Sequence, residues 1–273
     1  MSSHDQRDAR YVEILLEPLR RSADYLPKMG GGEEVNFDGF ADLYGSDPLY
    51  HWMGLDSPLM FAAHKAAGGM TSVYRQLGIG CERLFRQVLK DELALTAEQV
   101  VWSYEKAPDE EFGKNGERNK PRVLSLDGRV EVSDVADSAA RQRVIEWINE
   151  QRAELSISAP LKGAVFEVRQ GYKSADSKRQ NADLANAAQA LGDSYLPVLT
   201  LMSTQINRVI QTRYRTGNWA ILTGTVGTDS PTTSTFDFLK EVVGCDLPAF
   251  FEQNTADLRR STEGILTKLL ESS

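Results

Sequence analysis

The segment 163–173 (GAVFEVRQGYK) most constrains what this chain can fold into. It contains a run of small, β-branched and aromatic residues, typical of a buried strand: Ala164, Val165, Phe166 and Val168. Side chains alternate between the two faces of a strand, so one face carries Glu167, Arg169, Gly171 and Lys173. Because burying charge costs free energy, this face indicates a site at which a carboxylate and cations act on one ligand.

The overall composition is that of a globular protein. The 273 residues are 41% hydrophobic and 26% charged, and the mean hydropathy is −0.38. The sequence has no run of about eighteen apolar residues and no basic-then-apolar layout at its start, so we expect no membrane partner and no signal peptide. Cys81 and Cys245 stand in apolar contexts without CxxC spacing. We therefore expect a cytoplasmic protein with two buried free thiols.

Charge is distributed unevenly along the chain. The net charge of −8 argues against general nucleic-acid affinity, which depends on cations that meet phosphates. The segment 162–179 nevertheless carries five cations and two acids, a local net charge of +3. An acidic protein with one basic segment is compatible with DNA that is held in one cleft and repelled elsewhere.

Helix and strand patterns alternate through the second half of the chain. We expect helices at 11–26, 58–95, 138–155, 177–191 and 204–215, strands at 100–105, 122–134, 163–173, 195–203 and 218–224, and mainly helix over the last forty residues. This order predicts an α/β fold in which a mixed central sheet is flanked by helices, with a helical N-terminal portion. We expect one domain at 1–273, with a helical portion at 1–95, an α/β core at 96–235 and C-terminal helices at 236–273.

Local signals refine these elements. The Gly-, Asp- and Pro-rich segment 28–58 indicates an ordered loop, and glycines at 68–69 and 78–80 predict breaks in the helical region 58–95. Thr96 and Gln99 can cap a short turn. The strand 122–134 has a turn near Asp127–Gly128. One face of the helix 138–155 is predicted to be buried: Ala140, Val144, Trp147, Ile148 and Gln151.

The strongest candidate for chemistry is Asp127 with Glu167 and either Arg169 or Lys173. Phosphodiester hydrolysis uses a divalent metal to polarise the phosphate and to lower the pKa of bound water. Mg²⁺ prefers one or two carboxylates completed by waters and phosphate oxygens, and two acids from neighbouring strands supply such a site. The alternative is structural, with Glu167 and Arg169 paired at an exposed edge and Asp127 serving as a turn residue.

The segment that follows the strand is dense in side chains that can read base edges. Arginine and lysine pair with guanine, asparagine and glutamine with adenine, and aspartate with cytosine. The candidate DNA-binding residues are Lys173, Ser174, Asp176, Lys178, Arg179, Gln180 and Asn181. A solvated loop and helix start is the structural alternative. The glycine patterns at 68–80 match neither GxGxxG nor a P-loop, so we expect no nucleotide cofactor.

The block FEVRQGYKSADSKRQNAD (166–183) resembles the active-site block of type II restriction endonucleases of the PD-(D/E)xK superfamily, in particular the ApaLI-like group. Further similar segments are LDGRVEV (126–132), GGMTSVYRQLGIGCERLFRQVL (68–89), YLPVLTLMSTQI (195–206) and VVGCDLPAFFEQN (242–254). The resemblance spans most of residues 60–270. It implies that the α/β fold is a PD-(D/E)xK nuclease core.

The resemblance also implies roles for individual residues. Asp127 matches the first metal-binding acid, with Glu131 and Asp109 as alternatives, and Glu167 matches the second. The lysine that the superfamily usually has two residues after this glutamate is Arg169 here. Because arginine stays protonated, it cannot act as a general base. Either Arg169 acts electrostatically or Lys173, on the same strand face, takes the role.

These observations favour a Mg²⁺-dependent type II deoxyribonuclease that cleaves both strands of a short palindromic duplex. A palindrome is most simply cut by one active site per subunit, so we expect a homodimer on double-stranded DNA. Two other hypotheses stay open. One is a catalytically inactive, sequence-specific DNA-binding protein on the same scaffold, and the other is a small-molecule α/β enzyme that binds an anionic substrate.

Overall fold

The computed structural model describes residues 3–29, 32–106, 121–172 and 177–271. It divides the chain into two compact units, of which unit 1 is Met1–Arg83 with Phe250–Ser273 and unit 2 is Leu84–Ala249. The division falls within the helices α4 (Pro58–Leu93) and α9 (Leu247–Leu270). The prediction of one domain stays a prediction, because contacts within a chain do not report whether its parts fold independently.

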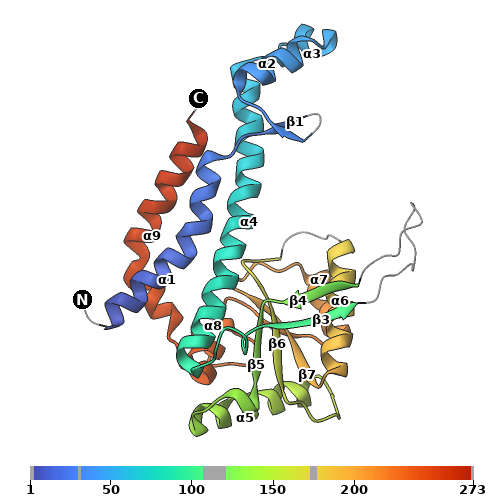
Figure 1. Cartoon of the computed structure of the whole chain (residues 1–273), viewed down its shortest axis with the longest axis vertical. Helices are drawn as coiled ribbons and strands as arrows, with labels where there is room; N and C mark the ends of the chain where they lie inside the picture. The colour runs from blue at the N-terminus through green and yellow to red at the C-terminus, as the bar shows by residue number, and fades with distance from the viewer. Residues whose placement is uncertain (1–2, 30–31, 107–120, 173–176, 272–273) are drawn as a thin grey trace. The chain divides into compact units, whose positions relative to one another are not determined.

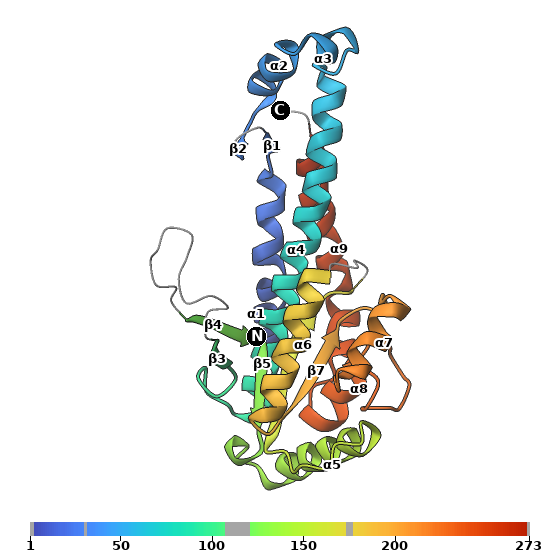
Figure 2. The ribbon, with the colours of Figure 1, turned by 90° about the vertical axis from the view of Figure 1, so that its right-hand side faces the viewer.

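Unit 1 is built from helices (Figures 1 and 2). Its elements before α4 are α1 (Ser3–Arg20), η1 (Arg21–Asp24), β1 (Lys28–Met29), β2 (Glu33–Glu34), α2 (Phe37–Gly45) and α3 (Pro48–Trp52). The core of unit 1 is made by buried residues of α1, α4 and α9, among them Leu16, Val73 and Leu269. Ile265 and Leu258 of α9 also pack into this core.

The predicted glycine breaks in the region 58–95 are wrong, because α4 is a continuous helix of 36 residues. A side chain added at Gly69 would lie 2.5 Å from Leu269, and one added at Gly80 would lie 2.9 Å from the main-chain oxygen of Leu15. The glycines therefore permit close approach of α9 and α1 to α4. This packing offsets the cost of about 1 kcal/mol that glycine imposes within a helix.

The prediction of a loop at 28–58 is also wrong in part, because the segment contains the short helices α2 and α3. Asn36 caps α2 by accepting a hydrogen bond from the Gly39 main-chain N–H. Asp47 caps α3 by accepting from two main-chain N–H groups, and Pro48 occupies the first turn. Both are standard helix-start signals that the abundance of glycine and aspartate obscured.

Unit 2 contains the predicted mixed sheet (Figure 1). Its strands are β3 (Trp102–Lys106), β4 (Arg122–Leu126), β5 (Gly128–Glu131), β6 (Gly163–Arg169), β7 (Tyr195–Leu201) and β8 (Ala220–Leu222). Within the described residues, a four-stranded sheet has the order β5-β6-β7-β8. β5 pairs antiparallel with β6, whereas β7 is parallel to both β6 and β8. β3 and β4 form a separate antiparallel pair.

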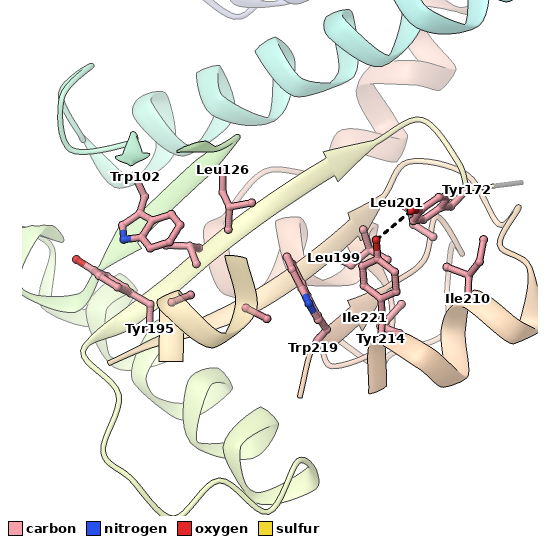
Figure 3. Packing of buried hydrophobic residues seen from close by; sticks show 13 residues of the cluster. Trp102, Leu126, Tyr172, Tyr195, Leu199, Leu201, Ile210, Tyr214, Trp219 and Ile221 are labelled. Carbon is pink, nitrogen blue, oxygen red and sulfur yellow. Dashed lines mark hydrogen bonds between the residues drawn. The ribbon is translucent and has the colours of Figure 1, made fainter. Parts of the chain in front are cut away.

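Helices cover both faces of this sheet. They are η2 (Val132–Asp134), α5 (Ser138–Glu154), α6 (Ser177–Gly192), α7 (Arg208–Thr216), α8 (Thr235–Asp237) and the π-helical turn η3 (Phe238–Val243). On one face, Phe166 of β6 contacts Trp147 of α5 and Phe238 of η3. On the other face, residues of β6 and β7 pack with α6 and α7 (Figure 3). The prediction of an α/β fold with a mixed sheet and flanking helices is confirmed.

Several local predictions are confirmed as well. The five residues expected on the buried face of α5 are all buried. Thr96 and Gln99 cap each other's main-chain N–H groups at 2.8 and 3.3 Å. Both cysteines are free and buried, and burial raises the pKa of Cys81 to about 12. No helix in the described part of the chain is both long and apolar enough to cross a membrane.

Candidate active site

The charged face of β6 is buried and paired internally. All seven residues of β6 are buried, and the Glu167 and Arg169 side chains are only 12% and 7% exposed. Glu167 Oε1 accepts a hydrogen bond from Arg169 Nε at 3.1 Å and forms an ion pair with a terminal nitrogen of Arg169 at 3.0 Å. The expected alternation of β6 is confirmed, but the pair lies inside the protein and not at the exposed edge that the structural alternative assumed.

Arg169 has a second anionic partner that the sequence did not identify. Its guanidinium forms a buried ion pair with Asp183 of α6, and it lies 4.1 Å from the centre of the Tyr172 ring. The hydroxyl of Tyr214 donates a hydrogen bond to the same Asp183 oxygen and shares a second one, of 3.0 Å, with the Tyr172 hydroxyl (Figure 3). Arg169 is therefore held in one position by β6, α6 and α7 together.

Asp183 and Tyr214 are the residues of this network that sequence reasoning missed. Asp183 closes the block 166–183, fourteen positions after its partner Arg169. Its contact with β6 depends on how α6 packs across the sheet, which no local pattern reports. In the sequence, Tyr214 is an aromatic residue within a predicted helix, and nothing there indicated its role in this network.

The electrostatics of the network favour a charged arginine and an un-ionised tyrosine. Burial by itself lowers the pKa of Arg169, but the carboxylates of Glu167 and Asp183 outweigh burial and hold that pKa above its ordinary value. Burial raises the pKa of Tyr214, and the hydrogen bond to Asp183 raises it further. Arg169 is thus a permanent cation, and it cannot serve as a proton acceptor.

Asp127 lies beside Glu167 at the end of β5. The ladder between β5 and β6 ends at the pair Gly128–Phe166, and Asp127 forms the bend just beyond it. Its carboxylate accepts a hydrogen bond of 2.8 Å from the main-chain N–H of Val168, the residue after Glu167. In an antiparallel pair, alternate residues of β6 direct their N–H groups toward β5. The N–H of Val168 lies beyond the last residue pair of the ladder, and the Asp127 carboxylate accepts its hydrogen bond in place of a main-chain oxygen.

The bend at Asp127 is held by a side chain of the last part of α4. Arg86 Nε donates a hydrogen bond of 2.8 Å to the main-chain oxygen of Asp127. Gly128 contributes close packing, since a side chain added there would lie 3.3 Å from the Phe85 ring. The sequence predicted the turn at this point, whereas the contacts that fix it come from residues at least 41 positions earlier in the chain.

The alternative first acids lie elsewhere. Glu131 is at the opposite end of β5, where it accepts a hydrogen bond of 2.5 Å from Tyr195. Burial and this hydrogen bond raise the pKa of the Tyr195 hydroxyl above its ordinary value. Asp109 lies outside the described residues. Of the two candidate first acids within the described residues, Asp127 is therefore the one that the fold brings next to Glu167.

The candidate DNA-binding residues fall into three groups. Lys173, Ser174 and Asp176 lie outside the described residues, as do the side chains of Lys178 and Arg179. Gln180 is buried, and its Oε1 accepts from Arg213 of α7 at 2.8 Å. Asn181 is exposed, and its Oδ1 accepts from the other terminal nitrogen of Arg213 at 2.5 Å.

The arginine that binds these two amides belongs to a basic helix. The sequence of α7, RVIQTRYRT, has three arginines and no acid: Arg208, Arg213 and Arg215. In the described part of the chain, none of the ion pairs that join arginines to carboxylates includes these three residues. The partners of Arg213 are neutral amides, so within the described residues α7 carries three arginines without a carboxylate partner, of which Arg213 contacts Asn181.

Asp127, at the end of β5, and Glu167 of β6 fit one class of metal. Carboxylate oxygens are hard ligands, and Mg²⁺ is usually held by one or two of them with waters and phosphate oxygens. No group of three or more His, Cys, Asp or Glu side chains among the described residues is placed to hold a metal ion. A Mg²⁺ site here would consist of Asp127 and Glu167, with water and phosphate as the other ligands.

Comparisons with known proteins do not add to this description. No protein-family model, no curated protein and no solved structure matches the chain. The similarity to ApaLI-like restriction endonucleases, the roles of the site residues and the identity of the metal therefore stay predictions.

Proposed function

We propose that this protein is a Mg²⁺-dependent type II endonuclease that cleaves both strands of a palindromic site in double-stranded DNA as a homodimer. The observation that carries the proposal is the hydrogen bond from Val168 to the Asp127 carboxylate, at 2.8 Å. This hydrogen bond joins the Asp127 carboxylate to the residue after Glu167, and it supports the proposal that the two acids share one metal ion.

The strand order around these acids supports the proposal. An antiparallel pair, β5 and β6, carries the two acids, and β6 continues through α6 to the parallel strand β7. This order resembles a PD-(D/E)xK nuclease core, in which the acids come from two adjacent strands. The likeness also extends to the spacing of Glu167 and the cation two residues later.

The roles of the site residues follow from their surroundings. Asp127 and Glu167 would hold Mg²⁺, which when bound lowers the pKa of its water and polarises the phosphate. Arg169 is buried between Glu167 and Asp183, so we assign it a positioning role in which it fixes the Glu167 carboxylate. The cation proposed to contact the phosphate is then Lys173, the other candidate of the sequence analysis, which follows β6 and lies outside the described residues.

The arginines of α7 would contact the DNA backbone. Cations that lack carboxylate partners gain most from meeting phosphates, since counterions are released from the DNA. Arg213 also fixes the amides of Gln180 and Asn181 by binding their oxygens. The exposed Asn181 therefore presents its NH₂ group, and we propose that it donates to an acceptor on a base edge.

Cleavage of plasmid and phage DNA in the presence of Mg²⁺ tests the proposal. The wild-type protein should give discrete fragments. Glu167→Gln and Asp127→Asn keep an oxygen that can accept the observed hydrogen bonds but remove the charge that binds metal, so each should reduce the cleavage rate at least about a hundredfold. Both variants should still bind DNA.

Glu131→Gln is the matched control. It makes the same chemical change on β5, at the end of the strand away from Glu167, and should leave the cleavage rate unchanged. Equal rates for wild type and Glu167→Gln would refute the assigned site. Absence of cleavage by the wild-type protein on DNA that contains every hexameric sequence would refute the endonuclease.

A second candidate is a sequence-specific DNA-binding protein without catalysis. The observation that favours it is the burial of Arg169 at the position where the superfamily usually has a lysine. A gel-shift assay with Mg²⁺ separates the two candidates. Discrete complexes on a defined site without cleavage would support the binding protein, whereas cleavage that depends on Glu167 would exclude it.

A further inference from the structure

Unit 1 exposes a cluster of large apolar side chains on α2, α3 and the start of α4. The side chains of Trp52 and Leu59 are 79% and 81% exposed, and Met53 is 66% exposed. In the fully described segment 37–60, the large apolar residues that are exposed are Leu43, Leu49, Tyr50, Trp52, Met53 and Leu59. We call these six residues the Trp52 surface. In Figure 1, α2 and α3 lie at the N-terminal end of α4.

The helices that carry this surface are packed firmly on unit 1. Phe40 of α2 is fully buried, and its ring stacks on Tyr44 with the ring centres 4.2 Å apart. Phe40 also contacts Phe61 of α4, and the Tyr44 hydroxyl lies 3.1 Å from Nε2 of His64. Tyr50 extends the aromatic stack to α3. The apolar side chains are therefore displayed by fixed helices.

The six residues together expose a large apolar area. The six side chains together expose the equivalent of roughly 3.7 whole large side chains, which at about 200 Å² each gives on the order of 700 Å². The largest apolar patch of a typical monomer is about 300–600 Å². A standard protein–protein interface buries about 800 Å² on each partner. The summed exposed area of the six residues is thus close to the area that one partner contributes to a standard interface.

The charges of the segment that carries this surface disfavour DNA as its partner. The segment 37–60 contains four aspartates and no lysine or arginine. Two of the aspartates have local partners, since Asp47 caps α3 and Asp56 accepts a 2.6 Å hydrogen bond from His51 that lowers the pKa of Asp56. The other two, Asp38 and Asp42, leave the surroundings of the patch acidic. Such a surface repels phosphates.

We propose that the Trp52 surface binds the same surface of a second copy of this chain, forming a two-fold symmetric dimer. The area matches one side of such an interface, and an apolar surface with few uncompensated charges needs no oppositely charged partner. The proposal rests on the proposed function in one respect, because cutting a palindrome calls for two subunits. A basic protein partner is the competing occupant.

Sedimentation equilibrium on the full chain tests the proposal. The wild-type protein should be a dimer at about 10 µM, as expected for a dissociation constant near or below 1 µM. The variant Trp52→Ser/Leu59→Ser removes two exposed side chains and should weaken dimerisation by about thirtyfold or more for each central residue. A monomeric wild-type protein at this concentration would overturn the proposal and assign the surface to another protein.

Val226→Ser is the matched control. Val226 is a 61% exposed apolar residue of unit 2, so its replacement makes a similar change to an exposed side chain away from the Trp52 surface. The control should dimerise as the wild type does. Equal loss of dimerisation in the control and in the double variant would show that general surface hydrophobicity, and not the Trp52 surface, drives association, and would overturn the proposal.

Salt dependence separates a second copy from a basic partner. Asp38 and Asp42 of two copies repel each other, so raising the salt from about 0.05 M to about 0.5 M should leave the dimer as strong or stronger. A dimer that dissociates in high salt would overturn the proposal, since it would be held by opposite charges. Cleavage assays report separately on the proposed function, because dimerisation does not require Asp127 or Glu167.

Discussion

The charged face of β6 and the Trp52 surface are opposite departures from the usual distribution of residues. On β6, the charged residues Glu167 and Arg169 are buried, together with Asp183 of α6. On α3 and the start of α4, the large apolar residues Trp52 and Leu59 are mostly exposed. Buried charge and exposed apolar area both cost free energy in an isolated chain.

The difference lies in where each cost is compensated. The charges of β6 find partners within unit 2, through ion pairs and the hydroxyl of Tyr214. The side chains of the Trp52 surface gain nothing until another surface covers them. Stability measurements should therefore respond strongly to changes at β6 and weakly at Trp52, whereas association should respond in the reverse order.

Removal of the buried guanidinium should have the largest effect on stability. In Arg169→Gln the carboxylates of Glu167 and Asp183 stay buried without their cation, and breaking a buried pair in this way costs about 3–5 kcal/mol. Urea denaturation gives the free energy of unfolding. Arg169→Lys, which retains the charge, should lose less and gives a folded reference if Arg169→Gln does not fold.

Arg215→Gln provides the control for this change. It replaces an arginine on α7 that has no carboxylate partner among the described side chains, so we expect a change within about 0.5 kcal/mol. Equal stability of Arg169→Gln and Arg215→Gln would show that Arg169 does not stabilise the protein through Glu167 and Asp183. The contrast drawn here between β6 and the Trp52 surface would then be wrong.

Replacement of Asp237 should have a smaller effect on the free energy of unfolding, and this effect should depend on pH. Burial acts to raise its pKa, but hydrogen bonds from Thr228 and Ser230 outweigh burial and hold the pKa below its ordinary value. The resulting stabilisation is complete above the unfolded-state pKa of about 3.9 and is lost as the pH falls through the lower folded-state pKa. Asp237→Asn should cost about 1–2 kcal/mol at neutral pH.

Urea denaturation at several pH values checks this prediction. The difference between wild type and Asp237→Asn should shrink as the pH is lowered below about 4, because the wild-type carboxylate then becomes protonated. A difference that stays constant down to pH about 2 would show that the charge of Asp237 is not what stabilises unit 2.

The smallest effect on stability should come from the Trp52 surface. Trp52→Ser changes a side chain that is 79% exposed, so the free energy of unfolding of the monomer should change by no more than about 0.5 kcal/mol. Denaturation at protein concentrations well below the dimer dissociation constant isolates this quantity. A loss of several kcal/mol would mean that Trp52 packs within unit 1, which contradicts an exposed surface.

Much of the fold could be predicted from the sequence, because the strands and helices of unit 2 carry strong periodic patterns. The helix predicted at 138–155 is α5, and the strand predicted at 163–173 contains β6. The errors lie where glycine and aspartate were taken as loop signals. In α4 the glycines permit contact with α1 and α9, which no local pattern reports.

The candidate site was predictable only in part. Alternation along β6 correctly placed Glu167 and Arg169 on one face, and the turn at Asp127 was expected. The proximity of Asp127 to Glu167 depends on the register of β5 against β6, and the pairing of Arg169 with Asp183 depends on the packing of α6 on the sheet. Neither register nor packing can be derived from the spacing of residues along one strand.

By itself the sequence determined which residues alternate on β6, which face of α5 is buried, and that charge and amide side chains gather after β6. These properties follow from periodicity, which is local. Only the tertiary structure decided that Arg169 lies between two carboxylates and that Arg213 binds the amides of α6. The exposure of Trp52 was likewise decided by the tertiary structure. Burial and pairing depend on segments far apart in the chain, and their positions are set by the packing of the whole unit.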